Sequence, residues 1–417
     1  MTKQETLETY FGHKQFRPSQ EALIDALLSG RDVLGVMPTG AGKSLCYQIP
    51  ALMKTGVSLV ISPLISLMKD QVAALRNAGI PAAYINSSLT ASQYREVLRR
   101  AEEGRYKIIY VAPERLGAEG FTEFALKTKI AMIAVDEAHC VSQWGQDFRP
   151  SYLKIAGFLE TLPERPVVGA FTATATAEVK NDIIRFLALR DPLSLTTGFD
   201  RANLYFGVIK TNNKPVVFRE LIDRYIGDCG IVYCATRKTV DAVCAELKRR
   251  GLAASRYHAG MEDDERRRSQ EDFIQNRADV MVATNAFGMG IDKPDVRFVI
   301  HYNMPKNMES YYQEAGRAGR DGVHSLCMLL FSNDDIKTAE FLIGSSEKNA
   351  ELTERERRIL QRRDIIRLDK MTRYCEIDSC LRAYILGYFG EKPKRRCGNC
   401  GNCKRHGGYS FKLPFIC

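Results

Sequence analysis

The stretch that decides the fold reads Val33-Leu34-Gly35-Val36-Met37-Pro38-Thr39-Gly40-Ala41-Gly42-Lys43-Ser44. An apolar run of strand type leads into a glycine-containing loop, and a helical-looking segment follows it. This order aims backbone N–H groups and a helix N-terminus at a phosphate, and the glycines let the backbone approach closely. Lys43 can neutralise the β- and γ-phosphates, and the Ser44 hydroxyl can ligate Mg²⁺. The stretch therefore predicts a nucleoside-triphosphate site made by Thr39, Gly40, Ala41, Gly42, Lys43 and Ser44.

Two neighbouring acidic residues form a second element of the predicted site. The apolar run 130–135 ends in Asp136 and Glu137, which places two carboxylates at the carboxyl tip of a predicted strand. Asp136 can hold Mg²⁺ and its waters, and Glu137 can orient and deprotonate an attacking water. Taken alone, such a pair is equally typical of a helix start that the helix dipole favours. We expect His139 to couple the site to neighbouring segments rather than to bind a metal.

A third element lies far along the chain, at Gln313-Glu314-Ala315-Gly316-Arg317-Ala318-Gly319-Arg320. Small residues join Arg317 and Arg320, so both guanidinium groups can lean to one side of a helix start. An arginine at the γ-phosphate can contribute roughly 10³–10⁵ in turnover, whereas surface ion pairs are the alternative interpretation. The three elements together predict an ATP-hydrolysing motor whose catalytic residues are Lys43, Ser44, Asp136, Glu137, Gln313, Arg317 and Arg320.

Apolar strand-like runs alternate with helical stretches around these elements. Besides 33–36, the strand-like runs are 58–61, 107–111, 130–135, 167–171, 230–234, 279–283, 297–301 and 325–331. Alternation of this kind predicts parallel sheets with crossover helices. The runs fall into two groups separated by residues 191–215, which are rich in Gly, Pro and Asn. The predicted fold is α/β, with one doubly wound lobe over 1–205, another over 206–340, and ATP in the cleft between the lobes.

The bulk composition fits this organisation and suggests a polyanionic partner. With 417 residues, the chain is long enough for two or three domains, and its formal net charge is +10. Residues 351–405 hold 15 Lys/Arg against 8 Asp/Glu. A basic stretch appended to a motor favours nucleic acid as partner, although a solvated helix face is the commoner cause of a basic run. No targeting signal or membrane-spanning run is visible, so we expect a cytoplasmic or nuclear protein.

The chain closely resembles the RecQ family of DNA helicases, from about residue 7 to residue 403. Beyond the three elements above, the resemblance lies in segments 16–20, 62–71, 112–115, 140–150, 172–175, 199–201 and 286–294. It implies two tandem RecA-like lobes followed by a small helical zinc-binding module over 341–405 and a short tail over 406–417. It also implies an ATP-dependent helicase that moves 3′ to 5′ on single-stranded and tailed duplex DNA in repair or recombination. ATP, Mg²⁺ and Zn²⁺ are the implied cofactors, and no protein partner is implied.

The resemblance also assigns roles to single residues. Gln20 is implied to read the adenine edge and Arg17 to stack on the base, while His13 stands where the family commonly carries a tyrosine. Gly290 and Asp292 are implied to approach the nucleotide from the second lobe. Trp144 lies in an aromatic-rich loop that is implied to sense single-stranded DNA; base stacking there is worth about 1–3 kcal/mol. The residues implied to bind DNA or couple it to hydrolysis are Ser62, Gln143, Trp144, Phe148, Arg149, Thr172 and Thr174.

A cysteine cluster near the C-terminus predicts a structural metal. Cys397, Cys400 and Cys403 recur at three-residue spacing with glycines that permit tight turns. The resemblance implies Cys380 as the fourth zinc ligand, and Cys375 is the competing residue. An iron–sulfur cluster, redox thiols and unpaired cysteines are the alternatives to zinc. Four thiolates leave no open coordination position, so the zinc would be structural.

The chain departs from the family pattern at its C-terminal end. Family members commonly continue into a winged-helix domain, and the 14 residues after Cys403 are too few for one. Duplex unwinding is therefore expected to be weak. An RNA helicase of the DEAD/DEAH groups and a DNA-binding scaffold with little motor activity are the alternative functions. The expected location is the cytoplasm, at the nucleoid, in a bacterium and the nucleus in a eukaryote.

Overall fold

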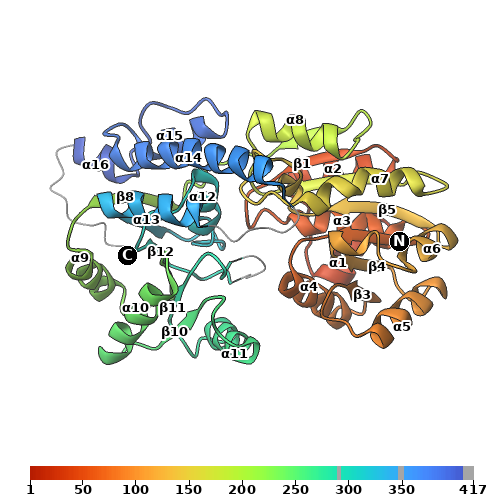
Figure 1. Cartoon of the computed structure of the whole chain (residues 1–417), viewed down its shortest axis with the longest axis horizontal. Helices are drawn as coiled ribbons and strands as arrows, with labels where there is room; N and C mark the ends of the chain where they lie inside the picture. The colour runs from red at the N-terminus through yellow and green to blue at the C-terminus, as the bar shows by residue number, and fades with distance from the viewer. Residues whose placement is uncertain (289–292, 346–351, 407–417) are drawn as a thin grey trace. The chain divides into compact units, whose positions relative to one another are not determined.

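The computed structural model describes residues 1–288, 293–345 and 352–406, and the chain forms two compact units. The first unit runs from Met1 to Gly198 and the second from Phe199 to Cys417. Figure 1 draws the first unit in red to yellow and the second in green to blue. Each unit is built on a parallel sheet joined by helices, so the predicted α/β class is confirmed.

The first unit contains a seven-stranded parallel sheet in the order β3-β4-β2-β5-β6-β1-β7. Its strands are β1 (Val33–Val36), β2 (Val57–Ile61), β3 (Ala82–Ile85), β4 (Ile108–Val111), β5 (Ile130–Val135), β6 (Val167–Thr172) and β7 (Leu193–Thr196). Its α-helices are α1 (Lys3–Phe11), α2 (Pro18–Leu28), α3 (Lys43–Met53), α4 (Ile65–Asn77), α5 (Ala91–Glu102), α6 (Phe121–Lys127), α7 (Lys154–Thr161) and α8 (Ala177–Phe186). Three short 3₁₀ segments are η1 (Pro113–Arg115), η2 (Ala138–Val141) and η3 (Pro150–Leu153).

Packing in the core of the first unit explains two glycines in its central strands. Phe171 of β6 is fully buried, and its ring lies 5.4 Å from that of Tyr47 of α3. A Cβ on Gly35 or Gly169, in β1 and β6, would lie 2.9 or 2.8 Å from the Phe171 ring. The missing side chains therefore make room for one large aromatic residue that joins α3 to the sheet beneath the phosphate loop.

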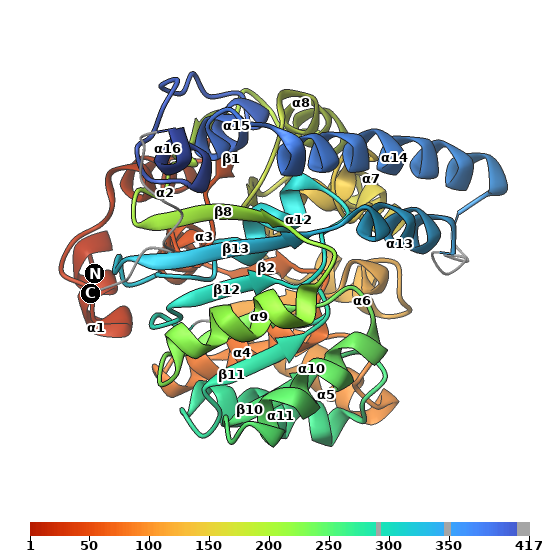
Figure 2. The ribbon, with the colours of Figure 1, turned by 90° about the vertical axis from the view of Figure 1, so that its left-hand side faces the viewer.

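The second unit contains a six-stranded parallel sheet in the order β10-β11-β9-β12-β13-β8. Its strands are β8 (Leu204–Lys210), β9 (Gly230–Tyr233), β10 (Ala254–Tyr257), β11 (Val280–Ala283), β12 (Phe298–His301) and β13 (Ser325–Phe331). Its helices are α9 (Lys214–Ile222), η4 (Asp223–Tyr225), α10 (Arg237–Arg249), α11 (Asp263–Ile274), α12 (Met308–Ala315), α13 (Asn333–Gly344), α14 (Glu354–Glu376), α15 (Leu381–Tyr388) and α16 (Gly401–His406). In Figure 2, α9 lies in front of the second sheet and α12 behind it.

The division between the units comes slightly before the boundary predicted at residue 205. The stretch 191–215, which separates the two predicted groups of strands, contains β7 and β8, one in each unit. β8 pairs with β13 from Leu204 to Lys210, so the second sheet already begins inside the region assigned to the first lobe.

The cysteine-rich segment is part of the second unit. Thr353 and Glu356 form a capping box at the start of α14, because each side chain accepts a hydrogen bond from the other's backbone N–H. α16 packs on β8, where Phe206 and Cys400 form an isolated parallel bridge. The stretch predicted as a separate module over 341–405 therefore shares its packing with the second sheet.

Among the described residues, no helix combines the length and apolarity needed to cross a bilayer.

A close contact in the second core gives a test of the packing. A Cβ added to Gly230 of β9 would lie 2.1 Å from the buried ring of Phe298 on β12. We expect Gly230→Ala to lower the free energy of unfolding by about 1–3 kcal/mol, because the ring has no room to move. Gly344→Ala, at a helical glycine with no atom within 4 Å of the added Cβ, is the control and should change it by less than about 0.5 kcal/mol. Urea unfolding measures both, and equal values for the two variants would contradict this packing.

Candidate functional site

The phosphate loop connects β1 to α3 in the first unit, as the sequence predicts. Gly40 and Gly42 have φ values of 83° and 77°, a left-handed conformation that glycine adopts without strain. Lys43 and Ser44 are the first two residues of α3, so they stand at a helix N-terminus. Met37 N–H donates to the Thr172 carbonyl at 2.9 Å, which ties the start of the loop to β6. The local geometry is that of an anion-binding loop.

Arg17 and Gln20 hold this loop from outside. The Gln20 amide nitrogen donates to the carbonyls of Ala41 and Gly42 at 3.1 Å each, and its oxygen accepts from the Arg17 backbone at 2.9 Å. The Arg17 guanidinium donates to the Gly40 carbonyl at 2.7 Å. The predicted pairing of Gln20 with adenine therefore requires these bonds to exchange. His13 is exposed nearby in the chain, and its predicted stacking role stays a prediction.

Lys43 lies between the two predicted carboxylates. Its Nζ is 3.2 Å from Asp136 Oδ1 and 3.1 Å from Glu137 Oε1, and all three side chains are largely buried. Burial by itself lowers the pKa of Lys43, but Asp136 and Glu137 outweigh it and raise the pKa above its ordinary value. Burial raises the pKa of Asp136, opposed by Lys43. Burial also disfavours the Glu137 anion, yet Lys43 and His139 hold the pKa of Glu137 well below its ordinary value.

The His139 ring lies between Glu137 and Thr172 of β6. Glu137 has φ 48°, an unusual conformation for a residue other than glycine, and it starts the η2 segment. His139 Nδ1 lies 3.3 Å from Glu137 Oε2 and 2.9 Å from Thr172 Oγ1. The Thr172 hydroxyl in turn donates to the Thr174 carbonyl at 3.1 Å. His139 thus joins the acidic pair to the predicted coupling threonines, in agreement with the role expected for it.

The aromatic-rich loop begins beside the same histidine. A Cβ on Gly145 would lie 2.1 Å from the His139 carbonyl oxygen, so the loop packs tightly against η2 only because residue 145 is glycine. Trp144 is 38% exposed, whereas Gln143 and Phe148 are half-buried. Arg149 donates to the Pro63 carbonyl at 2.9 Å, and the neighbouring Ser62 hydroxyl is fully buried without a hydrogen-bond partner in the described structure. The exposed Trp144 side chain therefore lies in a loop that packs tightly against η2.

The predicted arginines follow α12 in the second unit. Gln313 is on α12 and is 9% exposed, Arg317 is 6% exposed, and Arg320 is half-buried. A Cβ on Gly288 would lie 2.5 Å from an Arg317 guanidinium nitrogen, so this glycine leaves the space that the side chain occupies. Burial raises the pKa of Tyr233, and the positive charge of Arg317 partly opposes this shift. The side chains of Tyr233 and Arg317 therefore lie close together. Gly290 and Asp292 lie outside the described residues.

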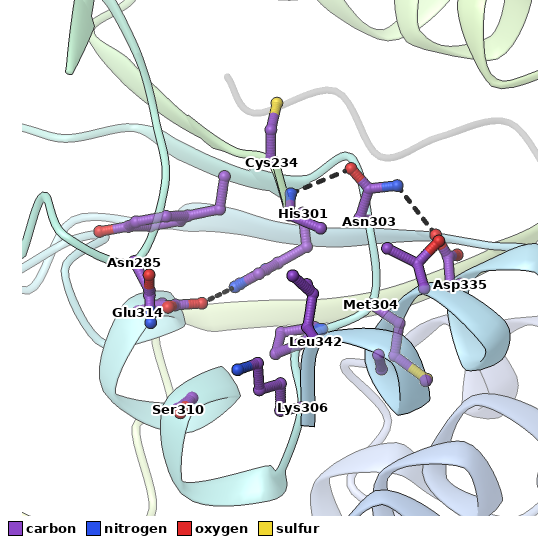
Figure 3. Close-up of a pocket in the computed structure, with 15 residues that line it drawn as sticks. Cys234, Asn285, His301, Asn303, Met304, Lys306, Ser310, Glu314, Asp335 and Leu342 are labelled. Atoms are coloured by element: carbon purple, nitrogen blue, oxygen red, sulfur yellow. Dashed lines mark hydrogen bonds and ion pairs between the residues drawn. The ribbon is translucent and has the colours of Figure 1, made fainter. Parts of the chain in front are cut away.

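A cavity of about 200 Å³ opens at the carboxyl ends of β9 and β12 in the second unit (Figure 3). His301 points toward Glu314 of α12, with its Nε2 2.9 Å from Glu314 Oε2. Asn303 accepts from the Ala235 N–H at 3.1 Å and donates to Asp335 at 2.9 Å. Lys306 also lines the cavity, and burial lowers its pKa. Sequence reasoning missed this network because its members are single residues on four different segments.

The cysteine cluster consists of Cys380, Cys397, Cys400 and Cys403, with all four sulfur atoms within 4.8 Å of one another. A tetrahedral zinc with bonds of about 2.3 Å needs sulfur atoms roughly 3.8 Å apart, and Cys380 and Cys400 are separated by 3.9 Å. Backbone N–H groups of Ala383, Asn399 and Cys403 donate to three of the sulfurs, as suits thiolates. Cys375 is buried in α14 outside the cluster. The donor set fits zinc.

Family comparisons agree with these sites. Residues 17–182 match the family described as DEAD/DEAH box helicase, and residues 213–322 match the helicase conserved C-terminal domain. Residues 333–404 match the RecQ zinc-binding family. The chain is 49% identical over 401 residues to the ATP-dependent DNA helicase RecQ of Bacillus subtilis, a match that covers 96% of this chain. The chain belongs to the RecQ helicase family.

Other relatives support the family assignment, and this chain spans only part of their length. The RecQ helicase of Haemophilus influenzae is 41% identical, and the ATP-dependent helicase SGS1 of Saccharomyces cerevisiae is 42% identical over 93% of this chain. This chain spans 66% of the Bacillus relative, 62% of the Haemophilus relative and 27% of SGS1. Among solved structures, the helicase MrfA covers 95% of this chain with a TM-score of 0.68, and Mss116p covers 94% with 0.67. At 18% and 17% identity, these two structures share the helicase fold with this chain.

The metal centre yields a direct test. We expect Cys380→Ser to reduce bound zinc well below one per chain and to destabilise the segment around α15 and α16, because one ligand of the four is lost. Cys375→Ser is the matched control, a buried cysteine in the same region that should leave zinc content unchanged. Elemental analysis of the purified variants measures this. Full zinc in Cys380→Ser together with loss in Cys375→Ser would move the ligand assignment to Cys375.

Proposed function

We propose that this chain is a DNA-stimulated ATPase that moves 3′ to 5′ along single-stranded DNA and unwinds tailed duplexes, acting in repair or recombination. The observation that carries the proposal is the convergence of Lys43 with Asp136 and Glu137 at a glycine-rich helix N-terminus. One ammonium between two buried carboxylates forms a site that can exchange a carboxylate partner for a phosphate. The same chain carries the four-thiol cluster of its family.

The nucleotide is held by residues of the first unit. Thr39 to Gly42 would present backbone N–H groups, Lys43 would bind the β- and γ-phosphates, and Ser44 with Asp136 would hold Mg²⁺. The bound metal supplies positive charge against the phosphate oxygens during hydrolysis. Once Lys43 turns to phosphate, Glu137 loses the cation that most depresses its pKa and becomes the stronger base toward an attacking water.

DNA acts on this site through the aromatic-rich loop. A base stacks on Trp144, and the loop passes the displacement through Gly145 to His139, which contacts both Glu137 and Thr172. Gln143, Phe148, Arg149, Ser62 and Thr174 support the same coupling. The Glu137 conformation at φ 48° is a place where a small movement can change the direction of the carboxylate.

The second unit contributes charge to hydrolysis through Arg317 and Arg320, with Gln313 beside them. Gly290 and Asp292 approach the same nucleotide, as family likeness implies. DNA rather than RNA is the proposed substrate because the Bacillus and Haemophilus relatives, at 49% and 41% identity, are named DNA helicases. The RNA-bound neighbours share the fold at 17–18% identity. A DNA substrate places the motor at the nucleoid or in the nucleus.

The proposal predicts hydrolysis that depends on Lys43. We expect single-stranded DNA to raise ATP turnover strongly and RNA to raise it little, and Lys43→Ala to lower turnover by at least about 100-fold while DNA affinity is kept. Phosphate release and fluorescence anisotropy measure the two properties, and duplexes with a 3′ or a 5′ tail test direction. Turnover stimulated equally by RNA would favour an RNA helicase, and substantial turnover in Lys43→Ala would refute the site.

A second prediction concerns the coupling of DNA to hydrolysis. We expect Trp144→Ala to lower DNA-stimulated turnover by about 10-fold while basal turnover changes less than about two-fold, because only base stacking is lost. Leu153→Ala is the control, since Leu153 is similarly exposed at 41% and follows the same loop. Steady-state rates with saturating DNA and without DNA distinguish the outcomes. Equal loss of both rates in Trp144→Ala would mean that the loop supports the fold rather than the signal.

A further inference from the structure

The Arg201 side chain forms hydrogen bonds with the turn that carries Arg317 and Arg320. This arginine turn, residues 316–320, follows α12, whose last carbonyls have no partner within the helix. The Arg201 guanidinium donates to the carbonyls of Gly316 at 3.2 Å, Ala318 at 3.0 Å and Gly319 at 2.8 Å. A planar guanidinium that spans three carbonyls fixes their orientation, and with it the directions in which Arg317 and Arg320 leave the backbone.

Arg201 is itself held from the cysteine-rich segment. Arg382 lies on α15, two residues after the zinc ligand Cys380, and is 5% exposed. Its Nη1 donates to the Arg201 carbonyl at 2.6 Å and to Asp200 Oδ1 at 2.5 Å, and its Nη2 donates to the Leu204 carbonyl. Arg382, two residues from Cys380, thus holds the backbone of Arg201, and the Arg201 side chain holds the arginine turn.

The other end of α12 is held by the same helix α15. Glu309, in the first turn of α12, is 5% exposed and accepts a hydrogen bond from the Tyr388 hydroxyl at 2.6 Å. Its Oε2 has no hydrogen-bond partner among the described residues. A buried carboxylate is costly unless hydrogen-bonded, so the Tyr388 hydroxyl strongly favours one position of this turn.

Aromatic side chains pack along α12 between its first turn and the arginine turn. The ring of Phe389, directly after α15, stacks on Phe199 at 4.5 Å and 15°. The Tyr312 hydroxyl of α12 donates to the Phe199 carbonyl at 2.7 Å. Tyr311 and Tyr374 hydroxyls lie 3.1 Å apart, which links α12 to α14. The first turn of α12 is thus held by α15, its middle by Phe199 and α14, and the turn that follows it by Arg201.

We propose that Arg201, Arg382 and Tyr388 are positioning residues for Arg317 and Arg320. Through them, helix α15, which directly follows the zinc ligand Cys380, influences the rate of ATP hydrolysis. The inference rests on the proposed function of this chain. A cationic group at the reacting phosphate is worth roughly 10³–10⁵ in rate, and a displacement of about 1 Å can cost 10²-fold. Because these residues act through the arginines and touch no nucleotide, they change kcat and leave the nucleotide affinity of the first unit unchanged.

Conservative variants with matched controls test this. Tyr388→Phe removes the hydroxyl that reaches Glu309, and Arg201→Lys leaves one point charge where a fork spanned three carbonyls. The control for the tyrosine is Tyr384→Phe, also on α15, whose hydroxyl donates to the Lys370 carbonyl of α14 at 2.8 Å. The control for the arginine is Arg219→Lys, an exposed side chain on α9 that donates to the Pro215 carbonyl at 3.3 Å.

All variants are compared for kcat and KM of ATP hydrolysis with saturating single-stranded DNA, for zinc content and for midpoint of thermal unfolding. We expect kcat to fall about 3–10-fold in Tyr388→Phe and at least about 10-fold in Arg201→Lys, with KM within about two-fold and zinc unchanged. Both controls should keep kcat within about two-fold.

Two results would overturn the inference. One is a normal kcat in Tyr388→Phe and Arg201→Lys at full zinc content. The other is a loss of kcat that the controls share in proportion to lost zinc or lower unfolding temperature, since this would reflect the fold alone. Absence of turnover in the unaltered chain would instead refute the proposed function, and the inference with it.

Discussion

The charge cluster of Lys43, Asp136 and Glu137 is the interaction on which the candidate site depends. Taking one ammonium and two carboxylates out of water is unfavourable unless they neutralise one another, and their mutual distances of 3.1 to 3.2 Å achieve this. The cluster can exist because β1 and β5 are parallel strands of one sheet, so the loops that follow them emerge at the same edge. Two negative charges against one positive charge also suit the site to a divalent cation.

The contacts around this cluster form a single path rather than separate features. Gln20 and Arg17 hold the loop carbonyls, Met37 joins the loop to Thr172, and His139 joins Thr172 to Glu137. A change in any one partner alters the electrostatics of the others, because burial removes the screening that water would provide. Trp144 is exposed in the loop that packs against η2 beside His139.

The second unit uses the same sheet architecture for a different purpose. Its strand ends carry a cavity and an arginine turn in place of a phosphate loop, and its cysteine-rich segment packs on β8 and α12. The Phe206 and Cys400 bridge joins the metal site to the sheet itself. The cysteine-rich segment therefore packs as part of the second unit rather than as a separate module.

The amino-acid sequence by itself determined the α/β class, the central strands, the phosphate loop, the acidic pair, the arginine turn and the three cysteines spaced by three, because each has a local pattern. The four strands that it did not reveal, β3, β7, β8 and β10, are the four edge strands of the two sheets. Three of them are only four residues long, whereas β8 is a seven-residue strand that lies inside the stretch interpreted as the boundary between the lobes. The structure confirmed Cys380, the ligand implied by the family resemblance, over Cys375. Tertiary structure alone decided that Gln20 holds the loop and that Arg382 reaches Arg201 from 181 residues away. Such contacts arise when folding brings distant segments together, and no local spacing of residues encodes them.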